Sequence, residues 1–300
     1  MPNIRANGLS LHYESTGRDD HPVILLVMGL AMQLTMWPDA FCALLVGEGF
    51  RVVRFDNRDV GLSTHLDHFG VPNVPLAYLR YALRRPLRSP YGIPDMADDT
   101  AALIDALDLG RTHIVGASMG GMIAQNLAAR FPDKLASLTS IMSSSAKRSV
   151  PNPSWRIRVA MMRGPGRNFN ESVERMLATQ RLLASRTFPL DEADVRRRCE
   201  LHFRRDSDPA GPARQIVAIA ASSDRTEIAR KIRVPTLVIH GDEDPLIPVA
   251  EGSETASLIR AGGGDARLRI FKGMAHDFPT PLLPAITEGI AAHCRRNAAD

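Results

Sequence analysis

The sequence predicts an α/β fold in which a mostly parallel sheet is covered by helices on both faces and interrupted by a helical insertion. Three observations lead to this prediction. Short β-branched runs alternate with stretches of helical spacing, which is the pattern of parallel strands joined by crossover helices. Some of these runs are apolar throughout, as strands buried on both faces are. Residues 149–230 break the alternation and contain no convincing central strand.

The first elements follow from local patterns. Residues 9–14 are expected to form an edge strand after the Asn7-Gly8 turn. Residues 23–27 form a continuous apolar run, as expected of a buried central strand, and residues 51–56 resemble a second strand. Between these two strands, residues 37–47 carry apolar side chains at helical spacing, which predicts a helix.

The same alternation continues through the rest of the chain. A helix is expected over residues 94–109, and Gly110 suits the left-handed turn that ends a helix. Another helix is expected over residues 119–130, before Phe131-Pro132. Further strands are predicted over residues 112–115, 135–142, 236–240 and 268–271.

The interval between the strands that end near residue 142 and begin near residue 236 is arginine-rich and helical in character. We expect residues 1–145 and 231–300 to form the core and residues 146–230 to form a helical cap. Its apolar side chains include Met161, Met162, Met176 and Leu177. Methionine-rich surfaces adapt to irregular apolar ligands, so this cap predicts a lipophilic binding site. A shorter irregular stretch, residues 67–90, is expected to line the same side.

The strongest chemical signal is the segment Gly116-Ala117-Ser118-Met119-Gly120-Gly121, which follows a predicted strand and opens a predicted helix. A sharp strand-to-helix turn forces its serine into a strained conformation and requires small neighbours. The Ser118 hydroxyl would then stand at a helix N-terminus, where free N–H groups favour developing negative charge. We therefore expect Ser118 to be a nucleophile.

A serine hydroxyl needs a base, and His276 is the expected one. It lies between the last predicted strand and the final helix, in a loop that can reach back over Ser118. His113 and His240 lie within or at the end of predicted strands, so we expect them to be packed, hydrogen-bonded residues.

The base in turn needs a carboxylate that orients its ring. The segment His240-Gly241-Asp242-Glu243-Asp244-Pro245 follows a predicted strand and offers three acids. Asp244 is the expected partner of His276, and Asp242 is the alternative.

An oxyanion hole would complete the site. One donor is expected to be the N–H of Met119, the residue after the nucleophile. The second is expected to be the N–H of Leu30, in the loop after the strand over residues 23–27, where Gly29 permits a close approach.

Nearly the whole chain resembles the α/β-hydrolase superfamily, in particular bacterial carboxylesterases that include aclacinomycin methylesterase-like proteins. The residues that carry this resemblance are Val27-Met28-Gly29-Leu30, residues 54–63, Gly116–Gly121, Gly241–Pro245 and Gly273-Met274-Ala275-His276. It implies a sheet of eight strands and supports Asp244 as the acid. The order Ser, Asp, His is the one this fold uses. Many relatives have His-Gly where this chain has Met28-Gly29, but a backbone donor does not depend on that side chain.

These observations predict a serine hydrolase that cleaves carboxylic esters through an acyl-enzyme intermediate, with no cofactor and no metal. The alternatives on the same triad are hydrolysis of a lactone, amide or carbon–carbon bond, and acyl transfer or perhydrolysis. A different class of alternative is a receptor-like protein that keeps the triad and only binds ligands.

Composition adds expectations about partners and location. The 300-residue chain is 44% hydrophobic, has a net charge of +4 and contains three widely spaced cysteines. The basic residues are interleaved with acids, so no nucleic-acid partner is expected. No apolar run is long enough for a signal peptide or a membrane span. We expect a cytoplasmic monomer or homodimer that acts on a small, lipophilic ester.

Overall fold

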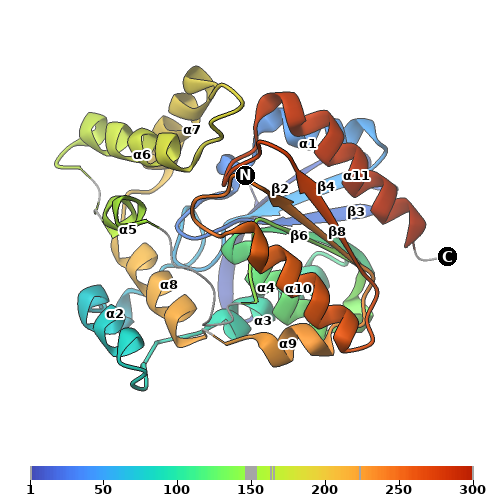
Figure 1. Cartoon of the computed structure of the whole chain (residues 1–300), viewed down its shortest axis with the longest axis horizontal. Coiled ribbons are helices and arrows are strands. Elements are labelled where there is room, and N and C mark those ends of the chain that lie inside the picture. Colours follow the sequence, from blue (N-terminus) through green and yellow to red (C-terminus); the bar gives the residue numbers. More distant parts are fainter. Residues whose placement is uncertain (1, 146–153, 163, 165, 223, 299–300) are drawn as a thin grey trace.

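The computed structural model describes residues 2–145, 154–162, 164, 166–222 and 224–298. These residues form an eight-stranded sheet in the order β1-β2-β4-β3-β5-β6-β7-β8 (Figure 1). The strands are β1 (Asn3–Ala6), β2 (Leu9–Thr16), β3 (Val23–Val27), β4 (Arg51–Phe55), β5 (Thr112–Ala117), β6 (Leu135–Ile141), β7 (Thr236–Gly241) and β8 (Ala266–Phe271). Only the β1–β2 and β2–β4 pairings are antiparallel. The predicted mostly parallel sheet of eight strands is therefore confirmed.

The prediction that residues 9–14 form an edge strand is wrong. β2 pairs with β1 on one side and with β4 on the other, so β1 is the edge of the sheet. The sequence of β1, Asn3-Ile4-Arg5-Ala6, is short and half polar. Such a segment lacks the apolar alternation by which a strand is detected, because only its last residue, Ala6, is buried.

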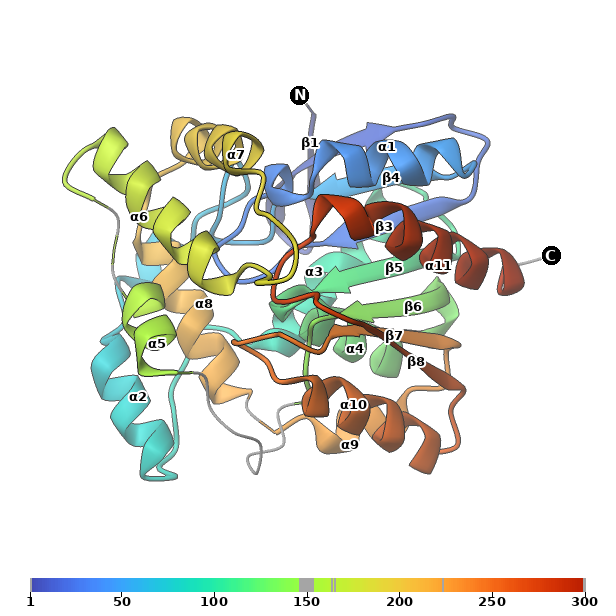
Figure 2. The same cartoon turned by 45° about the horizontal axis from the view of Figure 1, so that its top comes forward.

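Helices cover both faces of the sheet. On one face, α1 (Asp39–Gly47) packs against α11 (Leu283–Arg296), and on the other α3 (Ile93–Ala106) packs against α4 (Met119–Arg130). α10 (Val249–Ala261) lies on the same face as α4, and α9 (Thr226–Lys231), the last helix before β7, packs against both of them (Figure 2). Strands β3, β5 and β6 are buried along their whole length, as central strands between two helical layers must be.

The predicted helices over residues 37–47 and 94–109 are confirmed with shifted ends, and the helix over residues 119–130 is confirmed with the predicted ends. α3 ends three residues before the predicted Leu109, yet Gly110 does adopt the left-handed conformation, with φ of 63°. One-turn 3-10 helices complete the core at Leu34–Met36, Asp67–Phe69, Pro132–Lys134 and Thr280–Leu282.

Four helices between β6 and α9 lie beyond the carboxyl ends of the strands (Figure 2). They are α5 (Trp155–Met162), α6 (Phe169–Leu183), α7 (Glu192–Arg205) and α8 (Ala210–Ala221). α6 and α7 share a small core of Val173, Leu177, Val195 and Cys199. No strand occurs among the described residues of this interval. Residues 146–153, where the predicted insertion begins, and the side chains of Met161 and Met162 lie outside the description.

We expect residues 67–90 to be irregular from the sequence, and the structure shows that this is wrong in part. The stretch contains α2 (Val74–Ala82), which packs against α8. The Asn73 side chain accepts a hydrogen bond from the N–H of Leu76 and thereby starts the helix. Pro75 in the first turn is compatible with helix geometry, because the N–H it lacks would be unpaired there anyway.

In the described part of the chain, no helix is both long enough and apolar enough to cross a membrane.

Candidate active site

Ser118 occupies a strained turn between β5 and α4. Its φ of 55° and ψ of −121° are unfavourable for a residue with a side chain, so the surrounding structure must hold it there. The N–H of Ser118 donates to the carbonyl of Ile141 on β6, at 3.0 Å. Its own carbonyl accepts from the Ser143 hydroxyl, at 2.8 Å. The turn thereby presents the half-buried Ser118 side chain at the start of α4.

The neighbouring glycines permit this turn because there is no space for side chains. A Cβ on Gly116 would lie 2.3 Å from the carbonyl oxygen of Gly120. A Cβ on Gly120 would lie 2.0 Å from the carbonyl oxygen of Val27, at the end of β3. The prediction that small residues must flank the serine is therefore confirmed by direct steric contact.

Three side chains from different parts of the chain form a continuous hydrogen-bonded series. His276 Nε2 lies 3.0 Å from Ser118 Oγ, and His276 Nδ1 lies 2.8 Å from Asp244 Oδ2. The structure thus brings together the three residues expected from the sequence. Asp242, the alternative acid, instead accepts a hydrogen bond from the N–H of Gly273 at 2.6 Å.

Asp244 is held as a carboxylate. Burial alone would raise its pKa, but the neighbouring His276 charge and hydrogen bonds from His240 and His276 hold the pKa well below its usual range. Its Oδ1 atom also accepts the N–H groups of Leu246 and Ile247, at 2.9 and 2.8 Å. A carboxylate fixed in this way can orient the ring of His276 and stabilise its protonated form.

The two expected oxyanion donors lie beside Ser118, since Met119 is the next residue and Leu30 follows Gly29, which lies close to the Ser118 side chain. Gly29 approaches so closely that a Cβ placed on it would lie 3.6 Å from Ser118 Oγ. The first helical bonds of α4 come from the N–H groups of Gly121 and Met122, which donate to the carbonyl of Ser118. Within the described chain, the N–H groups of Met119 and Leu30 donate to no protein acceptor. Both donors are therefore available to a ligand at Ser118.

The loop that carries Leu30 is held from both sides. Asn57 donates to the carbonyl of Met28 at 3.0 Å from the core side. From the other side, the fully buried Gln215 on α8 accepts the N–H of Ala31 at 2.8 Å and donates to the carbonyl of Arg58 at 2.8 Å. Ala31 has a φ of 60°, a conformation that favours glycine, so this bond holds a strained residue beside Leu30, the expected oxyanion donor.

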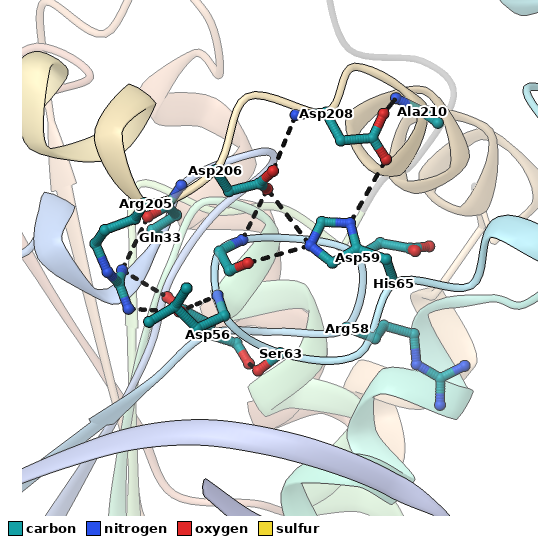
Figure 3. A network of polar contacts seen from close by, with 12 residues as sticks. Gln33, Asp56, Arg58, Asp59, Ser63, His65, Arg205, Asp206, Asp208 and Ala210 are labelled. Carbon is teal, nitrogen blue, oxygen red and sulfur yellow. Dashed lines mark hydrogen bonds and ion pairs between the residues drawn. The ribbon is translucent and has the colours of Figure 1, made fainter. Parts of the chain in front are cut away.

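Two ion pairs fasten α7 and α8 to the loop that follows β4. Arg205 at the end of α7 donates to the buried Asp56 at 2.8 Å and to Gln33 at 2.8 Å (Figure 3). Arg214 on α8 donates twice to Asp59, at 2.9 and 2.7 Å, and both side chains are fully buried. Burial would raise the pKa of Asp59, but hydrogen bonds from Arg214 lower it below its usual value.

A cavity of about 880 Å³ lies between the strand ends and helices α6 to α8, and both Ser118 and His276 open into it. Its lining is mostly apolar and includes Met28, Met36, Met142, Met176, Leu183 and Ile216. His202 on α7 also lines it, and burial lowers the pKa of this imidazole to about 4, so it is neutral. The expected methionine Met176 is thus part of the lining.

The other two histidines considered are packed, as predicted. His113 Nδ1 lies 2.8 Å from the hydroxyl of Ser137, but both are buried within the sheet, and burial lowers the pKa of His113 to about 4. His240 Nε2 lies 2.8 Å from the carbonyl of Ile247 and 3.5 Å from Asp244 Oδ2. His240 therefore supports the acid of the series, whereas the His113–Ser137 pair has no route to a ligand.

A cluster of possible metal ligands occurs in the described chain at His65, Asp67 and Asp208, whose ligand atoms lie within 4.8 Å of one another. Their carboxylates already have partners in the protein. Asp67 pairs with Arg214, and Asp208 accepts the N–H of Ala210 and lies 3.6 Å from His65 (Figure 3). These contacts join the loop after β4 to the start of α8.

Sequence reasoning did not identify Gln215, Arg205 or Arg214. Each acts on a residue about 150 positions or more away in the chain, so no local spacing could reveal the contact. The only available signal was the pair Arg214-Gln215 inside the otherwise small and apolar helix α8. Adjacent long polar residues in such a helix require buried partners.

Comparisons with known proteins agree with this arrangement. The profile of the alpha/beta hydrolase fold family matches residues 22–278. The rhodomycin D methylesterase DnrP of Streptomyces peucetius is 27% identical over 314 residues, which cover 97% of this chain and 97% of that protein.

Two further comparisons cover nearly the whole chain. The bifunctional esterase/perhydrolase DCH of Acinetobacter calcoaceticus is 26% identical over 309 residues, covering 96% of this chain and 97% of the relative. The crystal structure of the enol-lactonase from Burkholderia xenovorans LB400 superimposes with a TM-score of 0.71 and 24% identity, covering 98% of this chain and 100% of that one. At this identity the likeness shows a common fold.

Proposed function

The chain belongs to the α/β-hydrolase fold family, and from that premise we propose that it hydrolyses carboxylic esters with Ser118, His276 and Asp244 as its catalytic triad. Ester hydrolysis itself is supported by the methylesterase and esterase relatives. The observation that carries the assignment of residues is the unbroken series of hydrogen bonds from Asp244 through His276 to a serine at a strained turn.

The proposed reaction has two halves. Ser118 Oγ attacks the ester carbonyl carbon while its proton passes to His276 Nε2, and the oxyanion that forms is held by the N–H groups of Met119 and Leu30. His276 then protonates the leaving alcohol, which departs as the carbon–oxygen bond breaks. A water molecule, deprotonated by His276, attacks the acyl-enzyme and releases the acid and Ser118.

The substrate we propose is a small lipophilic ester. The cavity is large enough for a drug-sized molecule, and its methionine and leucine side chains favour an apolar one. Helices α5 to α8 would form the cap that determines its shape, with the core made by the sheet and its flanking helices. DnrP is named as a methylesterase, so methyl esters are the first class to test.

A panel of esters tests this proposal. Aryl esters of increasing acyl length, methyl esters of small and large apolar acids, a lactone and an amide would be compared by kcat/KM. We expect turnover of esters, with KM falling as the acid becomes more apolar, and much slower turnover of the amide. If the lactone were hydrolysed faster than the esters, lactones would replace esters as the proposed substrate class, with the same triad. Absence of any turnover in a folded protein would contradict the proposal.

Gln215→Leu tests whether α8 positions the oxyanion loop. Leucine is similar in size but can neither accept the N–H of Ala31 nor donate to Arg58, so the N–H of Leu30 should lose its alignment. We expect kcat to fall by about 10- to 100-fold, with little change in KM. This decrease in kcat should not exceed the one caused by complete removal of an oxyanion donor. Steady-state kinetics on a soluble aryl ester would measure this split.

Gln180→Leu provides the matched control, because Gln180 lines the cavity from α6 without contacting the oxyanion loop. It should change KM more than kcat. An unchanged kcat in folded Gln215→Leu would show that Gln215 does not position the loop.

The proposal also includes the location of the protein and its oligomeric state. We infer a cytoplasmic location from the three free, buried thiols of Cys42, Cys199 and Cys294, which suit a reducing compartment. The protein would act as a monomer or homodimer, and size-exclusion chromatography with light scattering would distinguish these states.

A further inference from the structure

Helix α2 presents an apolar stripe to solvent. Leu76, Leu79 and Leu83 are 47%, 53% and 62% exposed, and their spacing of three and four residues places them on one face of the helix and its C-cap. Tyr78 beside them is 49% exposed, and Ala77 is the only buried residue of α2. Leucines scattered singly on a surface need no explanation, but a stripe of this kind marks an interaction site.

The same segment carries an unusual charge. Arg80, Arg84, Arg85 and Arg88 are all exposed, and no acidic residue occurs between Asp67 and Asp95. None of the four guanidinium groups forms an ion pair with another described residue. The two flanking acids have other partners, since Asp67 pairs with Arg214 and Asp95 accepts the N–H of Gly92. The segment is therefore a locally uncompensated cluster of positive charge.

The stripe lies close to the cavity. Val74 in the first turn of α2 lines the cavity, as do Pro212, Ala213 and Ile216 of α8. α2 packs against α8 on the outer side of the cap region in both views (Figures 1 and 2). A molecule that covers the exposed side of α2 would thus lie next to the compartment that contains Ser118.

We propose that α2, with the arginines that follow it, docks the protein reversibly on an anionic lipid surface, from which lipophilic esters enter the cavity. A basic amphipathic helix binds such a surface by burying its apolar face among the acyl chains and pairing its cations with headgroup phosphates. The leucine stripe supplies the first interaction and the four arginines supply the second. Phe69 and Val71, 48% and 70% exposed just before α2, extend the apolar surface.

A lipid surface fits these residues better than an acidic protein does. The apolar side chains and the arginines lie within one short segment. A bilayer can bind both, because its acyl chains accept the leucines and its headgroup phosphates pair with the arginines. An acidic protein would need a separate, complementary pocket for each side chain. The docking itself depends only on α2 and the arginines that follow it, whereas the delivery of substrate rests on the proposed esterase function.

Vesicle co-sedimentation of the full-length protein tests the docking. We expect binding to vesicles of phosphatidylglycerol and phosphatidylcholine, weaker binding as salt is raised, and at least tenfold weaker partition to pure phosphatidylcholine. Leu79→Ser with Leu83→Ser, and separately Arg84→Glu with Arg85→Glu, should each reduce partition at least tenfold. Both variants should keep the activity of the parent on a soluble short-chain ester.

Two controls separate this proposal from the others. Arg5→Glu with Lys231→Glu changes the net charge equally, at exposed cations on β1 and at the end of α9, and should leave partition nearly unchanged. Ser118→Ala should bind vesicles normally, so loss of catalysis and loss of docking are distinguishable. Equal binding by the α2 variants and the parent, or no binding of the parent to anionic vesicles, would overturn the proposal.

Discussion

Ser118→Ala should lower kcat for a simple aryl ester by about 10⁴- to 10⁶-fold in a protein that remains folded, because the proposed acyl-enzyme forms on Ser118 Oγ. Removal of the Oγ atom leaves His276 and Asp244 in place but gives them no nucleophile to activate. Stopped assays with product quantification would measure the loss. Mass spectrometry after treatment with a fluorophosphonate should find the label on Ser118 in the parent and none in the variant.

Ser137→Ala is the matched control for this experiment. Ser137 is the other serine whose hydroxyl contacts a histidine ring in the described chain, but that pair is buried within the sheet. We expect its variant to keep activity close to that of the parent. Residual activity of Ser118→Ala within tenfold of the parent would contradict the proposed mechanism.

A second pair of substitutions tests which carboxylate acts as the acid of the proposed triad. Asp244→Asn should lower kcat by about 10⁴-fold, because the amide cannot stabilise the imidazolium and favours the wrong tautomer of His276. Asp242→Asn, which changes a carboxylate bonded only to the Gly273 N–H, should retain most activity. Equal effects of the two substitutions would mean that the hydrogen bond between Asp244 and His276 does not orient the base.

Arg214→Met should lower the free energy of unfolding by about 3–5 kcal/mol, because it leaves the Asp59 carboxylate buried without its partner. Arg214 donates two hydrogen bonds to Asp59 and one each to Asp67 and the carbonyl of Gly70. Burial raises the pKa of Asp59, and Arg214, together with the N–H of Leu66 and the hydroxyl of Tyr91, brings it below its usual value. Urea unfolding followed by circular dichroism would measure the change.

A second variant identifies the cause of that loss. Asp59→Asn combined with Arg214→Met removes the buried charge, so it should recover a large part of the stability lost in Arg214→Met alone. Arg18→Met, at an exposed ion pair with Asp20, should leave stability nearly unchanged. A loss below about 1 kcal/mol in Arg214→Met would show that this ion pair does not fasten α8 to the core.

The ion pairs Arg205–Asp56 and Arg214–Asp59 also bear on the proposed catalysis. Arg205 and Arg214 hold α7 and α8 against the loop after β4, and Gln215, next to Arg214, holds the strained Ala31 beside Leu30, the proposed oxyanion donor. In the proposed mechanism, the helices that line the cavity are thus bonded to the backbone that would stabilise the transition state. A substrate that displaces α8 would be expected to change kcat as well as KM.

Local patterns determined most of the core. The apolar run of β3 is visible because it is buried on both faces, and the glycines around Ser118 are visible because a Cβ on Gly116, Gly120 or Gly121 would clash with its neighbours. β1 escaped detection because it is short, lies at the sheet edge and buries only its last residue. α2 escaped detection because it is only nine residues long and carries Pro75 in its first turn, although its leucines recur at helical spacing.

The sequence by itself predicted the fold, the turn that carries Ser118 and the order of Ser118, Asp244 and His276, because each can be recognised from short local patterns and their order along the chain. Only the tertiary structure decided between Asp244 and Asp242, since two carboxylates in one turn differ only in which of them faces His276. It also revealed the bond from Gln215 to Ala31, which joins residues 184 positions apart. Contacts of this kind form only when the whole chain folds. The sequence near Gln215 therefore cannot predict that its partner is Ala31, and the sequence near Ala31 cannot predict Gln215.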